Sequence, residues 1–325
     1  MSPSPRPTPT TSPAPGPLPG TEPGTARVSG GSRTGTAVNL STQAFPDGAN
    51  QVFVATAAAF ADALAAGPAA ARQGGPVLLV DRDALPDATR AEIERLGARR
   101  IVVLGGIQAV STEVEIQLAA LGADVERLSG GDRYSTAAAV SRSTFPERVG
   151  VAYIATGDGF ADALSGGVAA ARNDGPVLLV NGSGVPQATH EELQRLSPRR
   201  IVVLGGNAAV PADVAAALDQ YTDGEVERVS GPDRYATSAA ISARVFPDPV
   251  DTVYVATGEN FPDALAAVPA AAKERAPLLL VRRDDVPDVI ATELARLRPR
   301  RIVILGGDAA VSAATAEMLE EFVVD

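Results

Sequence analysis

The residues best suited to chemistry in this 325-residue chain stand beside glycine-containing turns. Two such turns carry an acid, a base and a phenol in succession: Asp132, Arg133 and Tyr134 in SGGDRY, and Asp233, Arg234 and Tyr235 in SGPDRY. A guanidinium there can present forked donors to a carboxylate or a phosphate. The same pattern also fits a helix start, with Asp as the N-cap and Arg paired to a neighbouring acid. Both a ligand site or inter-unit contact and a purely structural role are therefore open.

A fainter copy of this motif precedes the other two and departs from them. Ser32 and Thr34 stand where the others have Asp and Tyr, while Arg33 is kept. The following stretch ATAAAFAD also lacks the glycine found at Gly157 and Gly258. We expect the first copy to keep its fold even if a ligand contact has been lost.

The inventory of residues gives catalysis little support. Cysteine is absent and His190 is the only histidine, so a repeated catalytic histidine is excluded, and Ser-His or Cys-His acyl transfer or histidine-based zinc chemistry would each rest on this one residue. His190 itself is expected to be a solvated surface side chain. Carboxylate chemistry through Asp132, Asp158 and Asp162 stays open, although acids at helix starts are commonly structural. We expect no catalytic residue, no metal and no cofactor.

The motif belongs to a long internal repeat. Arg127 and Arg228 open nearly identical segments 101 residues apart, and Arg27 opens a weaker copy 100 residues before Arg127. Three tandem units follow, which we place at residues 26–126, 127–227 and 228–325. Residues 1–25 are rich in Pro, Ser and Thr and have no periodic apolar face, which predicts a disordered tether.

Strands and helices alternate within each unit. In the second unit VAYIATG, PVLLV, RRIVVLGG and GEVERVSG have the length and composition of strands, and stretches such as FADALSGGVAAARND and PQATHEELQRL have helical spacing. This alternation predicts right-handed crossovers, so each unit is a small doubly wound, Rossmann-like α/β module with a parallel sheet. Ligands usually bind such sheets at the carboxyl ends of the strands, where the polar loops ATGDGFAD, LGGNAAVP and SGGDRY fall.

The glycine pair after the third strand of each unit does not predict a nucleotide site. No G-x-G-x-x-G or G-x-x-x-x-G-K-[ST] string occurs in the chain. The pairs beginning at Gly105, Gly205 and Gly306 are better explained by a positive φ or by close packing.

Composition narrows the possible partners and the compartment. The chain is 45% hydrophobic without an apolar run of the ~20 residues that would span a membrane, so membrane insertion is not expected. Its net charge of -11 and the lack of an aromatic-basic pattern argue against nucleic acid. No apolar signal segment follows Met1, and the Pro-, Ser- and Thr-rich start favours an exported protein whose signal has been removed.

The ordered set SGGDRYSTA, YIATGDGFADALSG, GPVLLV and PRRIVVLGG, present in three copies over residues 27–325, resembles the cell wall-binding repeat 2 family. The resemblance implies a Gram-positive, extracellular, wall-associated protein whose three modules assemble about a pseudo-threefold axis, as a monomer, and hold an anionic cell-wall polysaccharide non-covalently. The expected ligand-binding residues are Arg33, Arg133, Arg234, Asp132, Asp233, Tyr134, Tyr235, Thr156, Thr257, Asp162 and Asp263.

The net negative charge should repel an anionic polymer at long range, so such binding would have to be local. The arginine pairs before the third strands, Arg99-Arg100, Arg199-Arg200 and Arg300-Arg301, are further candidate cations, although a helix-capping and ion-pairing role fits them better. Two other functions remain open: an α/β enzyme with carboxylate chemistry, and a structural module that self-associates on a surface.

Overall fold

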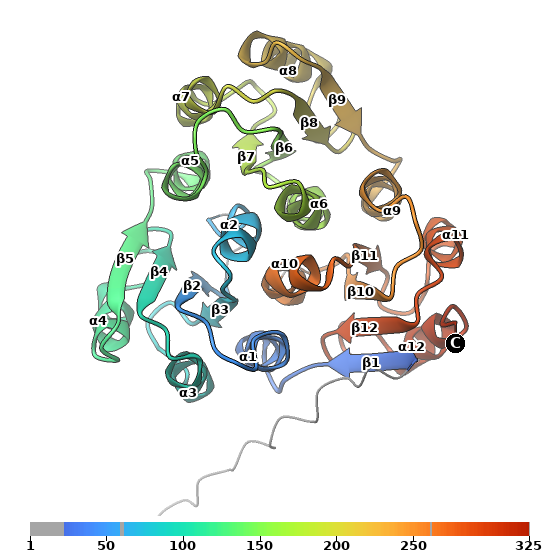
Figure 1. The fold of residues 1–325 in the computed structure, drawn as a ribbon, viewed down its shortest axis with the longest axis horizontal. Helices are drawn as coiled ribbons and strands as arrows, with labels where there is room; N and C mark the ends of the chain where they lie inside the picture. The colour runs from blue at the N-terminus through green and yellow to red at the C-terminus, as the bar shows by residue number, and fades with distance from the viewer. Residues whose placement is uncertain (1–22, 59–61, 261, 325) are drawn as a thin grey trace, which may run out of the picture.

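The chain folds into three α/β modules that form a ring, in a computed structural model that describes residues 23–58, 62–260 and 262–324. Figure 1 shows the modules as the three corners of a triangle around a shared centre. Within the described ranges the strands form three four-stranded sheets, and every strand pair is parallel. The predicted fold class, three small doubly wound modules in a pseudo-threefold arrangement, is confirmed.

The three sheets have the same strand order. The first is β3 (Val77–Val80), β2 (Gln51–Thr56), β4 (Arg100–Leu104) and β5 (Asp124–Leu128). The second is β7 (Val177–Val180), β6 (Ala152–Thr156), β8 (Ile201–Leu204) and β9 (Val226–Val229). The third is β11 (Leu278–Val281), β10 (Thr252–Thr257), β12 (Arg301–Leu305) and β1 (Gly24–Val28). The order reverses between the two central strands of each sheet, which creates the kind of crevice that binds ligands in such folds.

The N-terminal strand closes the ring. β1 pairs with β12 in register from Gly24 opposite Arg301 to Val28 opposite Leu305, so the third module takes its fourth strand from the start of the chain. β1 begins two residues inside the range expected for the tether, since the N–H of Gly24 donates to the carbonyl of Arg300 and that of Thr25 donates to Glu320 Oε2. Residues 1–22 of the tether lie outside the described part of the chain.

Helices cover both faces of each sheet. The helices that begin at the repeated motif lie at the module boundaries: α1 (Arg33–Ala44), α5 (Arg133–Thr144) and α9 (Arg234–Val245). The outer helices are α3 (Asp87–Leu96), α4 (Thr112–Ala119), α7 (Gln187–Leu196), α8 (Ala212–Ala216) with the 3-10 turn Ala217–Tyr221, α11 (Asp288–Leu297) and α12 (Ala313–Glu320).

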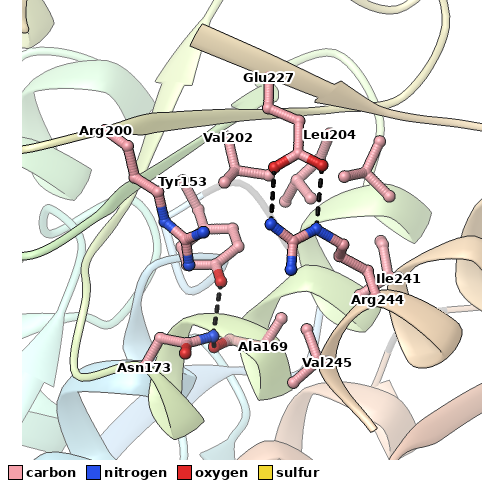
Figure 2. A pocket seen from close by; sticks show the side chains of 11 residues that line it. Tyr153, Ala169, Asn173, Arg200, Val202, Leu204, Glu227, Ile241, Arg244 and Val245 are labelled. Carbon is pink, nitrogen blue, oxygen red and sulfur yellow. Dashed lines mark hydrogen bonds and ion pairs between the residues drawn. The ribbon is translucent and has the colours of Figure 1, made fainter. Parts of the chain in front are cut away.

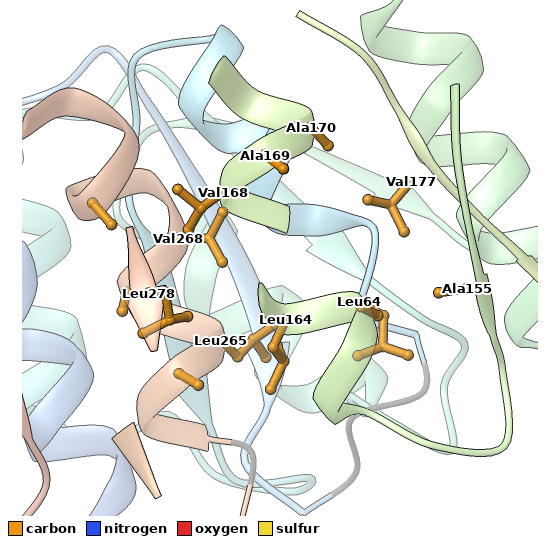
Figure 3. Close-up of a cluster of buried hydrophobic side chains, with 14 of the residues drawn as sticks. Leu64, Ala155, Leu164, Val168, Ala169, Ala170, Val177, Leu265, Val268 and Leu278 are labelled. Atoms are coloured by element: carbon orange, nitrogen blue, oxygen red, sulfur yellow. The ribbon is translucent and has the colours of Figure 1, made fainter. Parts of the chain in front are cut away.

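Three Ala-rich helices meet at the centre: α2 (Ala66–Arg72), α6 (Ala161–Arg172) and α10 (Pro262–Glu274). Gly67, Gly167 and Val268 occupy equivalent repeat positions there. A Cβ on Gly67 would lie 2.6 Å from Cβ of Val268, and a Cβ on Gly167 would lie 3.2 Å from its Cγ2. One valine therefore occupies space that the two glycines leave. Figure 3 shows the apolar side chains that α6 and α10 bring to this shared core, including Leu164, Val168 and Leu265.

Each module also buries a glutamate paired to an arginine three residues later, at Glu92, Glu192 and Glu293. In the second module Glu192 accepts from Ser141 Oγ at 2.6 Å and from Arg195 Nη2 at 2.6 Å. The same Nη2 donates to the carbonyl of Phe145 at the end of α5, so the pair ties α7 to α5. Sequence reasoning missed this contact, although E-x-x-R recurs at the repeat period.

Candidate functional site

A cleft of about 530 Å³ lies between the second and third modules. Thr156, Asp158 and Asp162 line it from the second module, and Asp233 and Arg234 line it from the third. The structure thus brings predicted residues from two successive repeats together in one cleft.

Most of the other predicted residues lie at the two remaining module boundaries. Asp132, Arg133 and Tyr134 begin α5 next to the first module. Asp263 of the third module lies near Arg33 at the start of α1, since its carboxyl interacts with Arg33 electrostatically, and Thr257 ends β10 of the same module. The eleven residues therefore form three related groups around the ring.

The motif arginines connect the start of a helix to the loop after the central strand of the same module. Arg33 Nη1 donates to the carbonyl of Ala57 at 3.1 Å, and Arg234 Nη1 donates to that of Gly258 at 2.5 Å. Arg133 Nη1 makes the equivalent bond to Gly157. Arg133 Nη1 also lies 4.0 Å from Asp158 Oδ1. A guanidinium carries five N–H donors, so these contacts through Nη1 leave the other nitrogens for further acceptors.

The motif acids are helix caps. Asp132 Oδ1 accepts from the backbone N–H of Ser135 at 2.7 Å, and Asp233 Oδ1 accepts from that of Ala236 at 2.8 Å. Ser32 makes the same cap to Gly35 at 3.1 Å. The departure in the first unit therefore preserves the helix start, and the capping role considered for these acids is confirmed.

The motif tyrosines pack against glycines in the loops after β6 and β10. A Cβ on Gly157 would lie 2.6 Å from Cε1 of Tyr134, and one on Gly258 would lie 2.7 Å from Cε1 of Tyr235. Burial raises the pKa of both phenols. The Tyr235 ring is buried, and the guanidinium carbon of Arg282 lies 5.1 Å from its centroid.

The two predicted threonines are buried and shape the same loops. Thr156 Oγ1 accepts from the N–H of Asp158 at 3.1 Å, and Thr257 Oγ1 accepts from the N–H of Glu259 at 3.2 Å. Each hydroxyl fixes the turn that follows its strand, which is the turn whose carbonyl the motif arginine contacts.

Asp162 and Asp263 are half-buried and face the module that follows their own in the ring. Burial raises the pKa of the Asp162 carboxyl, and the charge of Arg234 and a hydrogen bond from Thr237, both on the next module, partly offset this. Asp263 is in the same situation, with its pKa raised by burial and partly lowered by Thr36 and Arg33. The sequence analysis missed the threonines, although Thr36, Thr136 and Thr237 occupy one repeat position.

The glycine that opens each GG pair makes room for these aspartates. Gly105, Gly205 and Gly306 have φ of +88°, +93° and +90°. A Cβ on Gly306 would also lie 2.5 Å from Asp263 Oδ2. Positive φ and close packing, as predicted, explain these glycines.

The arginine pairs lie at the opposite end of the strands from the motif, because they precede or begin β4, β8 and β12. Arg100 pairs with Glu126, and Arg301 pairs with Glu274. Their predicted structural role is thus observed in the first and third modules. Arg200 differs from both, since no ion pair to it is found among the described residues.

His190 is not the solvated surface side chain that we expected. It is half-buried, and its Nδ1 lies 2.6 Å from the hydroxyl of Tyr221, with the two rings edge to face at a centroid distance of 5.4 Å. The lone histidine therefore attaches α7 to the turn after α8.

The fold is thus a ring of three repeated α/β modules, with a cleft beside the repeated motif at the joint between the second and third modules. The family model of Cell wall binding domain 2 (CWB2) matches residues 27–115, 127–215 and 228–316. The chain belongs to this family.

Relatives and solved structures agree with the family. The chain is 30% identical to the N-acetylmuramoyl-L-alanine amidase LytC of Bacillus subtilis over 92% of its own length and 58% of LytC. It is 29% identical to the amidase enhancer of the same organism over 81% of its length and 35% of that protein. The structure is similar to Cwp6 from Clostridium difficile (TM-score 0.87, 25% identity, 94% of this chain and 48% of that one) and to Cwp8 (TM-score 0.84, 28% identity, 92% and 51%). The chain thus spans only part of each of these proteins.

In the described ranges, no helix combines the length and apolarity that crossing a bilayer requires.

Proposed function

We propose that this chain is a non-catalytic anchor that holds an anionic cell-wall polysaccharide non-covalently at the three module boundaries. The observation that carries the proposal is the cleft that Arg234 lines, together with the recurrence of the same arginine-to-carbonyl bond at Arg33 and Arg133. Membership of a cell wall binding family supports the kind of partner. The protein acts outside the cell, on the wall, as a single chain.

The chemistry of the cleft suits an acidic sugar polymer. The Arg234 guanidinium at the cleft can donate to a carboxylate or phosphate of the polymer. Asp158 and Asp162 can accept hydrogen bonds from the hydroxyl groups of a sugar. The anionic groups of the polymer have no hydrogen to donate to these two carboxylates. Because the cleft offers both a cation and hydrogen-bond acceptors, it can bind a polysaccharide that carries both anionic groups and hydroxyls, despite the negative net charge of the protein.

Three weak contacts on one rigid body reinforce one another. Once one boundary has bound, the other two meet the same polymer at a high effective concentration, which can raise avidity by ~10² or more. Each contact on its own stays reversible. A repeating ligand thus explains why the motif recurs around the ring.

Binding of the full chain to purified cell walls at increasing salt tests the proposal. The decisive variant replaces the three motif arginines, Arg33→Gln, Arg133→Gln and Arg234→Gln. The matched control removes the same charge from the other end of the strands, Arg99→Gln, Arg199→Gln and Arg300→Gln, where all three side chains are exposed. We expect saturable, salt-sensitive binding that weakens at least about tenfold in the first variant and less than about twofold in the control.

The thermal stability of each variant is measured alongside, because the motif arginines also hold loop carbonyls. Single substitutions that leave the fold intact then give the contribution of each boundary. Equal loss of binding in both triple variants would mean that general charge, not the motif, attracts the wall. Turnover of wall material without adsorption would favour an enzyme, and concentration-dependent assembly without adsorption would favour a structural module.

A further inference from the structure

A second hollow lies at the other end of the joint between the second and third modules. This partly open cavity of about 80 Å³ is lined by β6, β8 and β9 on one side and by α6 and α9 on the other (Figure 2). Val202 and Ile241 give it apolar walls, while Tyr153 and Arg200 supply polar groups. Because Arg200 precedes β8, the cavity is separate from the cleft at the carboxyl ends of the strands.

The charges around this cavity differ from those at the equivalent places in the ring. In the first module Arg100 is neutralised by Glu126, and in the third Arg301 is neutralised by Glu274. The repeat counterpart of Glu274 in the second module is Asn173, which carries no charge.

The remaining acid of the second module is already paired. Glu227, the counterpart of Glu126, accepts two bonds from Arg244, at 2.9 and 3.0 Å. These bonds, and more weakly the charge of Arg200, lower the pKa of Glu227, so this one carboxylate stays ionised beside two arginines. Among the described residues no carboxylate lies within ion-pair distance of Arg200. The cavity therefore carries one positive charge in excess.

The phenol beside Arg200 has a hydrogen to donate. Asn173 Nδ2 donates to the hydroxyl oxygen of Tyr153 at 2.8 Å and to the carbonyl of Ala169 at 2.9 Å, which fixes the orientation of the amide. The Tyr153 oxygen is thus an acceptor here, and its own O–H hydrogen remains available. Burial raises the pKa of Tyr153, so the phenol keeps its proton at neutral pH.

We propose that this cavity binds a short-chain monocarboxylate, with the carboxylate between Arg200 and Tyr153 and the apolar tail against Val202 and Ile241. The volume of about 80 Å³ is far below the roughly 300–1,000 Å³ of pockets for drug-sized ligands, so only a group of a few heavy atoms fits. A single excess positive charge balances a monoanion. A phosphate dianion would bring a second negative charge close to Glu227.

Calorimetric titration of the full chain with sodium propionate tests the proposal, at constant ionic strength and with propionamide as the neutral probe. We expect saturable binding of propionate, a rise in melting temperature on its addition, and neither effect with propionamide. Arg200→Gln should weaken binding at least about tenfold. The matched control Arg100→Gln removes an arginine whose charge Glu126 already balances, and it should leave the affinity unchanged.

The other repeats supply two further variants. Asn173→Glu recreates the Tyr254, Glu274 and Arg301 group of the third module, so it should abolish propionate binding without lowering the melting temperature of the ligand-free protein. Tyr153→Phe recreates Phe53 of the first module and should weaken binding about three- to tenfold.

Undiminished binding in Asn173→Glu, equal binding of propionamide, or tighter binding of inorganic phosphate at this cavity would each overturn the proposal. If Arg200→Gln does not fold, propionate binding by Asn173→Glu decides whether the proposal holds. Wall adsorption should be the same in wild type and Asn173→Glu, which separates this site from the proposed anchoring function.

Discussion

The ring of Tyr134 occupies the space that a side chain on residue 157 would need, since a Cβ on Gly157 would lie 2.6 Å from its Cε1. Gly258 stands in the same relation to Tyr235 at 2.7 Å. Where the first module has alanine at residue 57, it has the smaller Thr34 in place of tyrosine. Thr34 and Ala57 are therefore coupled, because the smaller side chain at residue 34 leaves room for the methyl group at residue 57.

This relationship predicts a pair of coupled substitutions. Gly157→Ala should lower the free energy of unfolding by about 1–3 kcal/mol, because the added methyl overpacks the contact. In the background of Tyr134→Thr, the same Gly157→Ala change should cost much less. Urea unfolding of the four proteins gives the coupling energy, and additive costs would contradict a direct contact.

The buried glutamates make a second prediction. Glu192→Ala should cost about 3–5 kcal/mol, since Arg195 would lose the partner for its partly buried charge. Glu191→Ala, an exposed position on the same helix, serves as the control and should change stability little. Denaturant unfolding measures both, and similar costs for the two would show that the pair does not stabilise the joint between α5 and α7.

The centre of the ring has room for one valine, Val268, whose repeat counterparts are Gly67 and Gly167. Gly67→Val should destabilise the protein by about 1–3 kcal/mol, because the new side chain meets Val268. Moving the valine with the double change Gly67→Val and Val268→Gly should recover part of the loss. Melting temperatures test this, and a double variant no better than the single one would mean that the three positions do not share one space.

Asp263 should make stability depend on pH. Its pKa is raised by burial, so the folded state holds the proton more tightly and the protein loses stability as pH rises through that pKa. Its Oδ1 also has no hydrogen-bond partner among the described residues. Asp263→Asn should therefore be more stable than wild type at pH 7, with an advantage that shrinks as pH falls to the ordinary range of aspartate.

Unfolding curves between pH 3 and pH 7 check this dependence. Asp223→Asn, an exposed acid, is the control and should follow the wild-type curve. An advantage of Asp263→Asn that stays constant with pH would show that titration of this carboxyl is not the cause.

The pairing of β1 with β12 predicts different outcomes for two truncations. Removal of residues 1–22 should leave unfolding unchanged, whereas removal of residues 1–28 takes away β1 and exposes the edge of β12. An exposed edge invites pairing with another chain, so the longer truncation should be less stable and should associate. Unfolding and light scattering compare the two, and equal stability would show that ring closure adds nothing.

The sequence determined the module and its number of copies. Apolar runs of strand length that alternate with helical stretches predict a parallel sheet. Because this pattern recurs three times at a nearly constant period, the sequence predicts three copies of the same module. The caps at Asp132 and Asp233 and the turns at Gly205 and Gly306 follow from local chemistry in the same way, because a cap or a positive φ depends on residues close in the chain.

Only the tertiary structure decided how the copies meet. It set Thr237 of one module on Asp162 of the preceding one, and β1 on β12 across almost the whole chain. It also paired Glu227 with Arg244, whereas the repeat counterpart of Glu227 in the first module, Glu126, pairs with Arg100. Such contacts join residues far apart in sequence, and their geometry comes from packing three modules around one axis rather than from any local pattern.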